Sequence, residues 1–127
     1  MSRTLAPGDL MRVLVVDDHR AMADYIVEHL RSQGQNAYAA YHPEDAIVSA
    51  ETSHPDAVIS DLNMPGMNGF ELAKALSERD PRCRIVLMTA TPEYMDFAPR
   101  DCPFPILQKA TLPDQILNAL AACAPAA

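Results

Sequence analysis

The chain has 127 residues, a hydrophobic fraction of 49% and a formal net charge of −7. This length suits one domain with its own core and is too short for two ordinary domains. The negative charge argues against nucleic acid as a direct partner, because phosphate contacts need clustered Lys and Arg. No apolar stretch approaches the roughly eighteen residues of a membrane span, and no signal-peptide pattern opens the sequence.

The cysteines and the ends of the chain complete this outline. Cys83, Cys102 and Cys123 are odd in number, widely spaced and without metal-ligand spacing. This usage is typical of reduced, mostly buried thiols, so we expect a cytoplasmic protein. Residues 1–10 lack periodicity and contain a Pro-Gly pair. We therefore expect a flexible leader over 1–10, one domain over 11–123 and a tail over 124–127.

From Met11 onward, the pattern alternates strand and helix five times. Short, mostly apolar runs predict strands near 12–16, 36–40, 56–60, 84–88 and 104–108, as expected of strands buried on both faces. The first helix carries an apolar stripe at helical spacing and ends at Gly34. The stripe consists of Ala23, Ile26, Val27 and Leu30.

The other helices are marked by their start and stop signals. Pro43, followed by two acids, opens the second helix, and Asn68 can cap the third. The fourth begins at residues 91–93 and is ended by Pro99 within about two turns, so it is atypically short. Residues 111–114 resemble a capping box that opens the last helix. The inward sides of the third and last helices comprise Phe70, Leu72, Ala73 and Leu76, and Ile116, Leu117 and Leu120.

Five strand–helix units imply an α/β fold with a doubly wound parallel sheet and right-handed crossovers. The flavodoxin-like strand order 2-1-3-4-5 is the natural choice. In this order the fifth strand is a sheet edge, which is where the proline at position 105 can be tolerated.

Polar side chains stand at the carboxyl ends of four predicted strands. Asp17 and Asp18 close the first strand, Asp61 the third and Thr89 the fourth, and Lys109 follows the fifth. These groups should meet at the edge where open α/β sheets bind ligands. Three neighbouring carboxylates raise each other's pKa unless a cation neutralises them, and Mg²⁺ suits such a set of hard oxygen ligands. A lysine and a hydroxyl beside them favour binding of a phosphoryl group.

Each of these residues alone has a plainer interpretation. A single acidic pair is as often a turn or helix-capping feature, a single lysine is usually solvated, and a strand threonine usually only packs. The four histidines, at positions 19, 29, 42 and 54, lack the mutual spacing of a metal site. The combination of acids, lysine and hydroxyl at neighbouring strand ends is what predicts the phosphoryl and metal site.

The residues at 15–18, 60–69, 87–90 and 107–109 closely resemble a response-regulator receiver domain, over roughly residues 11–123. The Asp-Leu-Asn-Met-Pro-Gly-Met-Asn-Gly stretch that begins at Asp61 is the most specific part. The resemblance implies that Asp61 accepts phosphate from a histidine kinase or a histidine phosphotransfer protein. It further implies Mg²⁺ held by Asp17, Asp18, Asp61 and the Asn63 carbonyl, and phosphoryl contacts from Thr89 and Lys109.

The resemblance also implies a role and partners for the chain as a whole. Such a domain belongs to a two-component phosphorelay, catalyses only its own phosphorylation and hydrolysis, and switches the binding of a downstream effector protein or domain. Asn63 and Thr91 occupy positions that flank the phosphoryl group in similar receivers.

The chain departs from the receiver pattern near its fifth strand. Ile106 stands where receivers typically carry an aromatic switch residue, and Phe104 lies two residues earlier on the same strand face. Ala110 follows the lysine where a cis proline is usual, so we expect a trans bond there. We therefore expect phosphorylation to order or shift segment 91–105, with Phe104 reporting the change.

Three other functions compete with the phosphoacceptor. An acid phosphatase or mutase with an Asp nucleophile would usually carry a second Asp two residues later, where this chain has Asn63. A flavin or nucleotide module would need a glycine-rich loop after the first strand, which is missing from the sequence. A degenerate receiver that binds a partner without phosphorylation is opposed by the intact acids, Thr89 and Lys109.

Overall fold

The computed structural model describes residues 11–64, 66–90, 104–109, 115–116 and 118–119. Within these residues a parallel sheet of five strands has the order β2-β1-β3-β4-β5, which confirms the predicted doubly wound topology. The strands are β1 (Arg12–Val16), β2 (Asn36–Ala40), β3 (Ala57–Asp61), β4 (Arg84–Thr89) and β5 (Ile106–Gln108). The helices are α1 (Arg20–Ser32), α2 (Pro43–Ser53) and α3 (Gly69–Arg79).

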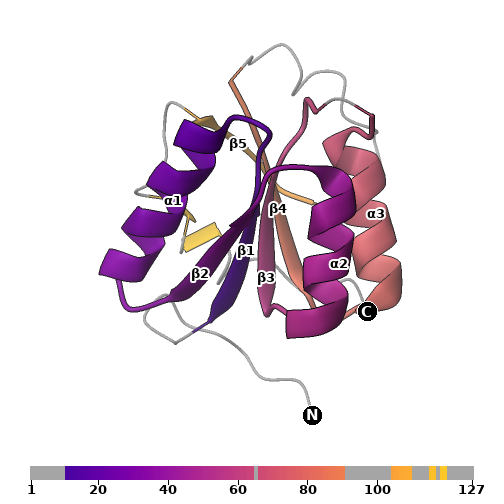
Figure 1. Ribbon diagram of the computed structural model, residues 1–127, viewed down its shortest axis with the longest axis horizontal. Coiled ribbons are helices and arrows are strands. Elements are labelled where there is room, and N and C mark those ends of the chain that lie inside the picture. Colours follow the sequence, from indigo (N-terminus) through magenta and orange to yellow (C-terminus); the bar gives the residue numbers. More distant parts are fainter. Residues whose placement is uncertain (1–10, 65, 91–103, 110–114, 117, 120–127) are drawn as a thin grey trace.

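The sheet separates two layers of helix (Figure 1). Helix α1 covers one face, and α2 and α3 cover the other side by side, joined by the Glu51–Arg79 ion pair. Alternate residues of each strand enter the two cores because side chains of a strand point to opposite faces. Thus Val13 and Val15 pack with α1, whereas Leu14 and Val16 pack with α2 and α3.

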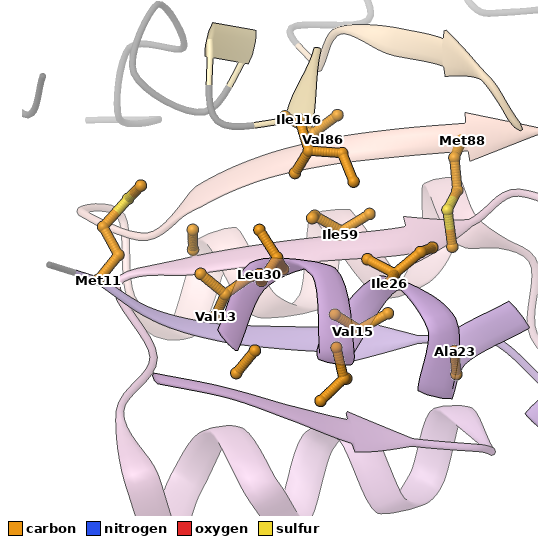
Figure 2. Packing of buried hydrophobic residues seen from close by; sticks show 13 residues of the cluster. Met11, Val13, Val15, Ala23, Ile26, Leu30, Ile59, Val86, Met88 and Ile116 are labelled. Atoms are coloured by element: carbon orange, nitrogen blue, oxygen red, sulfur yellow. The ribbon is translucent and has the colours of Figure 1, made fainter. Parts of the chain in front are cut away.

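The core on the α1 face uses the apolar stripe that the sequence predicts. Ala23, Ile26 and Leu30 are fully buried against the strands, and Ile116 joins them from near the end of the chain (Figure 2). The C-cap of α1 is Gln33, and Gly34 follows it with a φ of +89°, a conformation that glycine adopts without a steric penalty.

The starts of α2 and α3 also follow the sequence signals. Pro43 is the first residue of α2, where its missing N–H costs no hydrogen bond. Asn68 caps α3, its side-chain oxygen accepting a hydrogen bond from the Glu71 N–H at 2.9 Å. The inward side of α3 is confirmed as Leu72, Ala73 and Leu76, with Phe70 partly buried beside them.

Three predicted strands differ from the observed ones in their bounds. Strand β3 is displaced by one residue, so it ends on Asp61 rather than before it, and β4 continues one residue further than predicted, through Thr89. Strand β5 begins at Ile106 rather than at position 104, because Pro105 has no N–H to donate to a sheet. The Pro105 carbonyl still accepts a hydrogen bond from the Leu87 N–H at 2.8 Å, so the chain is already aligned with the sheet edge.

Several expectations lie outside the described residues. These are the leader over 1–10, the tail over 124–127, the short fourth helix, the capping box at 111–114, the trans bond before Ala110, and the side chains at positions 117 and 120. In the part of the chain that the structure describes, no helix is both long and apolar enough to cross a bilayer.

Candidate functional site

Three carboxylates lie close together at the carboxyl edge of the sheet. Two of them follow strand β1, and the third ends the neighbouring strand β3. Asp17 and Asp18 follow β1, and Asp61 is the last residue of β3, which pairs with β1 in parallel. Each carboxylate offers an oxygen within 4.8 Å of the oxygens offered by the other two. The apolar residues before each acid fix the strands, and the strand register then brings the acids together.

The two adjacent acids have different surroundings. Asp17 is fully buried, and its Oδ1 accepts a hydrogen bond from the His19 N–H at 3.0 Å. Asp18 is exposed, one residue further into the loop. The buried acid is therefore fixed by the protein, whereas the exposed acid faces the solvent from which a ligand would arrive.

Lys109 connects the acids of the two strands. Its Nζ donates a hydrogen bond to Asp17 Oδ2 at 2.8 Å and lies 3.4 Å from Asp61 Oδ2. Its side chain is only 14% exposed, so these charges interact with little screening by water. The sequence predicts that Lys109 reaches this edge, but it does not predict that Asp17 is its nearer partner.

The Asp61 carboxyl has an unusual proton affinity. Burial, reinforced by the negative charge of Asp17, raises its pKa from an ordinary 3.8 to about 6. Lys109 and the Asn63 N–H, which lies 3.4 Å from Asp61 Oδ1, act in the opposite direction without cancelling this effect. The cluster therefore carries more negative charge than one lysine neutralises, which is the condition under which a divalent cation binds.

Thr89 and Asn63 complete the set of candidates from the sequence. Thr89 is buried at the end of β4, one residue beyond the Met88 that pairs with Asp61. Asn63 is exposed in the loop after β3. The structure thus brings Asp17, Asp18, Asp61 and Lys109 into direct proximity and places Thr89 at the neighbouring strand end, whereas Thr91 lies outside the described residues.

One feature of this edge was not anticipated from the sequence. Gly69, the first residue of α3, packs directly on the backbone of Asp61, and a Cβ there would lie 2.4 Å from the Asp61 carbonyl oxygen. The available signal was the glycine that ends the Asp61 motif, eight residues after the aspartate. A cavity of about 300 Å³ between α2 and α3, lined by Pro55, Val58 and Cys83 among others, lies at the opposite edge and is not part of this site.

Comparison with known proteins decides the family. A profile described as the response regulator receiver domain matches residues 13–120. The chain belongs to this family. Response regulator receiver domains are signalling modules of two-component systems, and the sequence resemblance to them is confirmed.

Curated relatives agree with this assignment. The chain is 34% identical over 85 residues to the probable transcriptional regulatory protein TcrX of Mycobacterium tuberculosis, covering 67% of this chain and 36% of that protein. It is 32% identical over 111 residues to a response regulator receiver protein of Anaeromyxobacter sp., covering 86% of this chain and 47% of that protein. The chain therefore spans about a third to a half of the length of these relatives.

Solved receiver structures share the fold. The chemotaxis protein CheY4 of Vibrio cholerae has a TM-score of 0.77 at 26% identity, with 91% of this chain and 99% of that chain covered. The response regulator TrrA of Thermotoga maritima, solved in complex with Mg²⁺ and BeF, has a TM-score of 0.71 at 26% identity, with coverages of 84% and 92%.

Proposed function

We propose that this chain is the phosphoacceptor module of a two-component phosphorelay, in which Asp61 takes a phosphoryl group from a histidine kinase or a histidine phosphotransfer protein. One observation carries the proposal, namely the cluster of Asp17, Asp18 and Asp61 with Lys109 placed between its two strand ends. Such a cluster holds a carboxylate nucleophile beside groups that neutralise an arriving phosphoryl group.

The transfer exchanges one bond to phosphorus for another. An Oδ atom of Asp61 attacks the phosphorus of a phosphohistidine, a P–O bond forms, and the P–N bond breaks with its electron pair leaving on the imidazole nitrogen. The Lys109 ammonium neutralises charge on the oxygens of the transferred group, and the Thr89 hydroxyl donates a hydrogen bond to it. Water later cleaves the acyl phosphate, releasing inorganic phosphate and restoring the Asp61 carboxylate.

The residues at the site fit Mg²⁺. All three acids offer hard oxygen ligands within reach of one ion. Burial, together with the charge of Asp17, raises the pKa of the Asp61 carboxyl, and a bound cation would offset this cost of ionisation. We assign Asp17, Asp18, Asp61 and the Asn63 carbonyl as the residues that hold it. Bound there, Mg²⁺ supplies Lewis-acid stabilisation and screens the approach of two anions.

The output is a change in the binding of a downstream protein or domain. Two of the curated relatives are named as transcriptional regulatory proteins, and this chain matches 36% and 35% of their lengths. We propose a protein effector for this chain, because its charge of −7 disfavours direct binding to nucleic acid. We also propose that the exchange takes place in the cytoplasm, consistent with the buried, reduced thiol of Cys83.

Intact-mass measurement after treatment with acetyl phosphate and Mg²⁺ tests the proposal. The wild-type protein should gain one phosphoryl group, and the gain should disappear in Asp61→Asn and after chelation of Mg²⁺. Asp56→Asn is the matched control, because Asp56 immediately precedes the same strand at the opposite edge of the sheet. Labelling of Asp61→Asn at the wild-type rate would show that Asp61 is not the acceptor.

A further inference from the structure

The start of α3 approaches the nucleophile more closely than any residue with a side chain would allow. A Cβ at Gly69 would lie 2.4 Å from the Asp61 carbonyl oxygen and 2.8 Å from the Leu62 Cα. An ordinary van der Waals contact begins at 3.4 Å. A methyl group at Gly69 therefore requires the start of α3 and the Asp61 backbone to move apart by about 1 Å. Both of the close atoms are backbone atoms, which cannot swing aside as a flexible side chain can.

Asp61 is held firmly on its own side of this contact. It lies in β3, between β1 and β4, and is paired with Met88. The next residue donates its N–H to the Met88 carbonyl at 2.9 Å, and the Ser60 hydroxyl donates to the Asp61 carbonyl at 3.1 Å. The backbone that carries the carboxylate therefore has hydrogen bonds on both sides of the acid.

The helix is held equally firmly on the other side. The Gly69 N–H donates to the Leu62 carbonyl at 2.9 Å, and Asn68 caps the helix. One turn later, Leu72 and Ala73 are fully buried in the core beneath the sheet. Neither partner can retreat without losing hydrogen bonds or core packing, so the contact fixes the position of Asp61 relative to α3.

We propose that Gly69 is a positioning residue for phosphorylation, an inference that rests on the proposed function of Asp61. By carrying no side chain, it lets the N-terminus of α3 close against the nucleophile and hold the Asp61 carboxylate opposite Lys109 and the other two acids. An added methyl group displaces this carboxylate by a distance of the order of 1 Å. Misplacement of a reacting group by about 1 Å can cost roughly 100-fold in rate.

The chain provides matched controls for the substitution Gly69→Ala. Gly66 lies in the same loop and Gly34 follows α1, and both have a positive φ with no atom within 4 Å of an added Cβ. Alanine at either control site strains the backbone without contacting Asp61. The three variants therefore separate the loss of glycine's flexibility from the collision with the nucleophile.

The test measures the rate of phosphorylation by acetyl phosphate at saturating Mg²⁺, together with thermal unfolding. Gly69→Ala should be phosphorylated at least tenfold more slowly than Gly66→Ala and Gly34→Ala. A rate for Gly69→Ala equal to those of the controls overturns the inference. If Gly69→Ala does not fold, insertion of one glycine beside Gly66 loosens the same contact without a clash, and it should slow phosphorylation. Wild-type phosphorylation of that insertion variant also overturns the inference.

A second measurement separates this inference from the proposed function. The ¹³C resonance of the Asp61 side-chain carboxyl, recorded in the metal-free protein, should differ between Gly69→Ala and wild type but remain unchanged in Gly34→Ala. An unchanged resonance contradicts the positioning role whether or not phosphorylation occurs. If the wild-type protein is not phosphorylated while the resonance shifts as expected, the proposed function fails and the positioning of Asp61 by Gly69 stands.

Discussion

The burial of Asp61 beside other acids implies that its ionised form destabilises the folded protein. The Asp61 side chain is mostly buried, and the pKa of its carboxyl rises from 3.8 to about 6 on folding. Replacing the acid with a neutral amide of similar shape in Asp61→Asn should therefore stabilise the metal-free protein near neutral pH. A rise of about 2 pKa units corresponds to about 3 kcal/mol. Solvent screening at the edge of the sheet reduces the expected gain to about 1–2 kcal/mol.

The pH dependence follows from the direction of the shift. A carboxyl with a raised pKa in the folded state binds its proton more tightly there, so ionisation lowers the stability of the wild type as pH rises from 3.8 through about 6. The Asp61→Asn variant cannot ionise at this position, so its unfolding free energy does not fall for this reason. The unfolding free energy of the variant should therefore be close to that of the wild type below pH 4, exceed it increasingly between pH 4 and pH 6, and exceed it by a constant amount above about pH 7.

Urea unfolding followed by circular dichroism in the presence of EDTA measures this difference. Glu78→Gln is the control, since it removes the same unit of charge from an exposed position on α3. Addition of Mg²⁺ should reverse the order of stability by stabilising the wild type more than the variant. If Asp61→Asn is no more stable than the wild type at pH 7.5 without Mg²⁺, the electrostatic description of the cluster is wrong.

Three further results are expected. Asp18→Ala should weaken Mg²⁺ binding more than Asp17→Ala in a calorimetric titration. The reason is that Asp18 is exposed, whereas both carboxylate oxygens of Asp17 already accept hydrogen bonds from the protein. Equal or reversed losses of affinity would show that Asp18 is not the more important metal ligand of the two. Asn68→Ala should lower the unfolding free energy by about 1 kcal/mol through loss of the cap, and Asn68→Asp should not. With fluorinated phenylalanine, the ¹⁹F resonance of Phe104 should shift on beryllofluoride binding more than that of Phe70, which packs against the same core.

The fold was predictable because each of its elements carries a local signal. Strands buried on both faces leave continuous apolar runs, and the strands at 12–16 and 36–40 have the predicted bounds. Helix α2 begins at its proline and α3 at its cap, as the sequence indicates. Strand β5 was harder to delimit, since the apolar run continues through Pro105 while the strand hydrogen bonding does not.

The site was predictable in its membership but not in its internal contacts. Residues that end parallel strands meet at one edge whatever their identity, so the carboxylates and Lys109 could be grouped from the sequence. Which carboxylate is buried, and which one the lysine approaches more closely, depends on side-chain packing between strands that are distant in sequence. Lys109 and Asp17 are 92 residues apart, and no local pattern encodes their contact. The approach of Gly69 to Asp61 is likewise set by the placement of a whole helix.

The position of Lys109 links the proposed phosphorylation site to β5, the part of the chain that departs from the usual receiver pattern. On the proposed function, a phosphoryl group on Asp61 would add negative charge that competes with Asp17 for the Lys109 ammonium. Lys109 directly follows β5, whose three residues are paired with β4 and preceded by the Pro105 carbonyl bonded to Leu87. Phe104 packs against the α2–α3 core at the other end of this short strand. We therefore expect a displacement of Lys109 to be transmitted along this hydrogen-bonded strand to Phe104, without an aromatic ring at position 106.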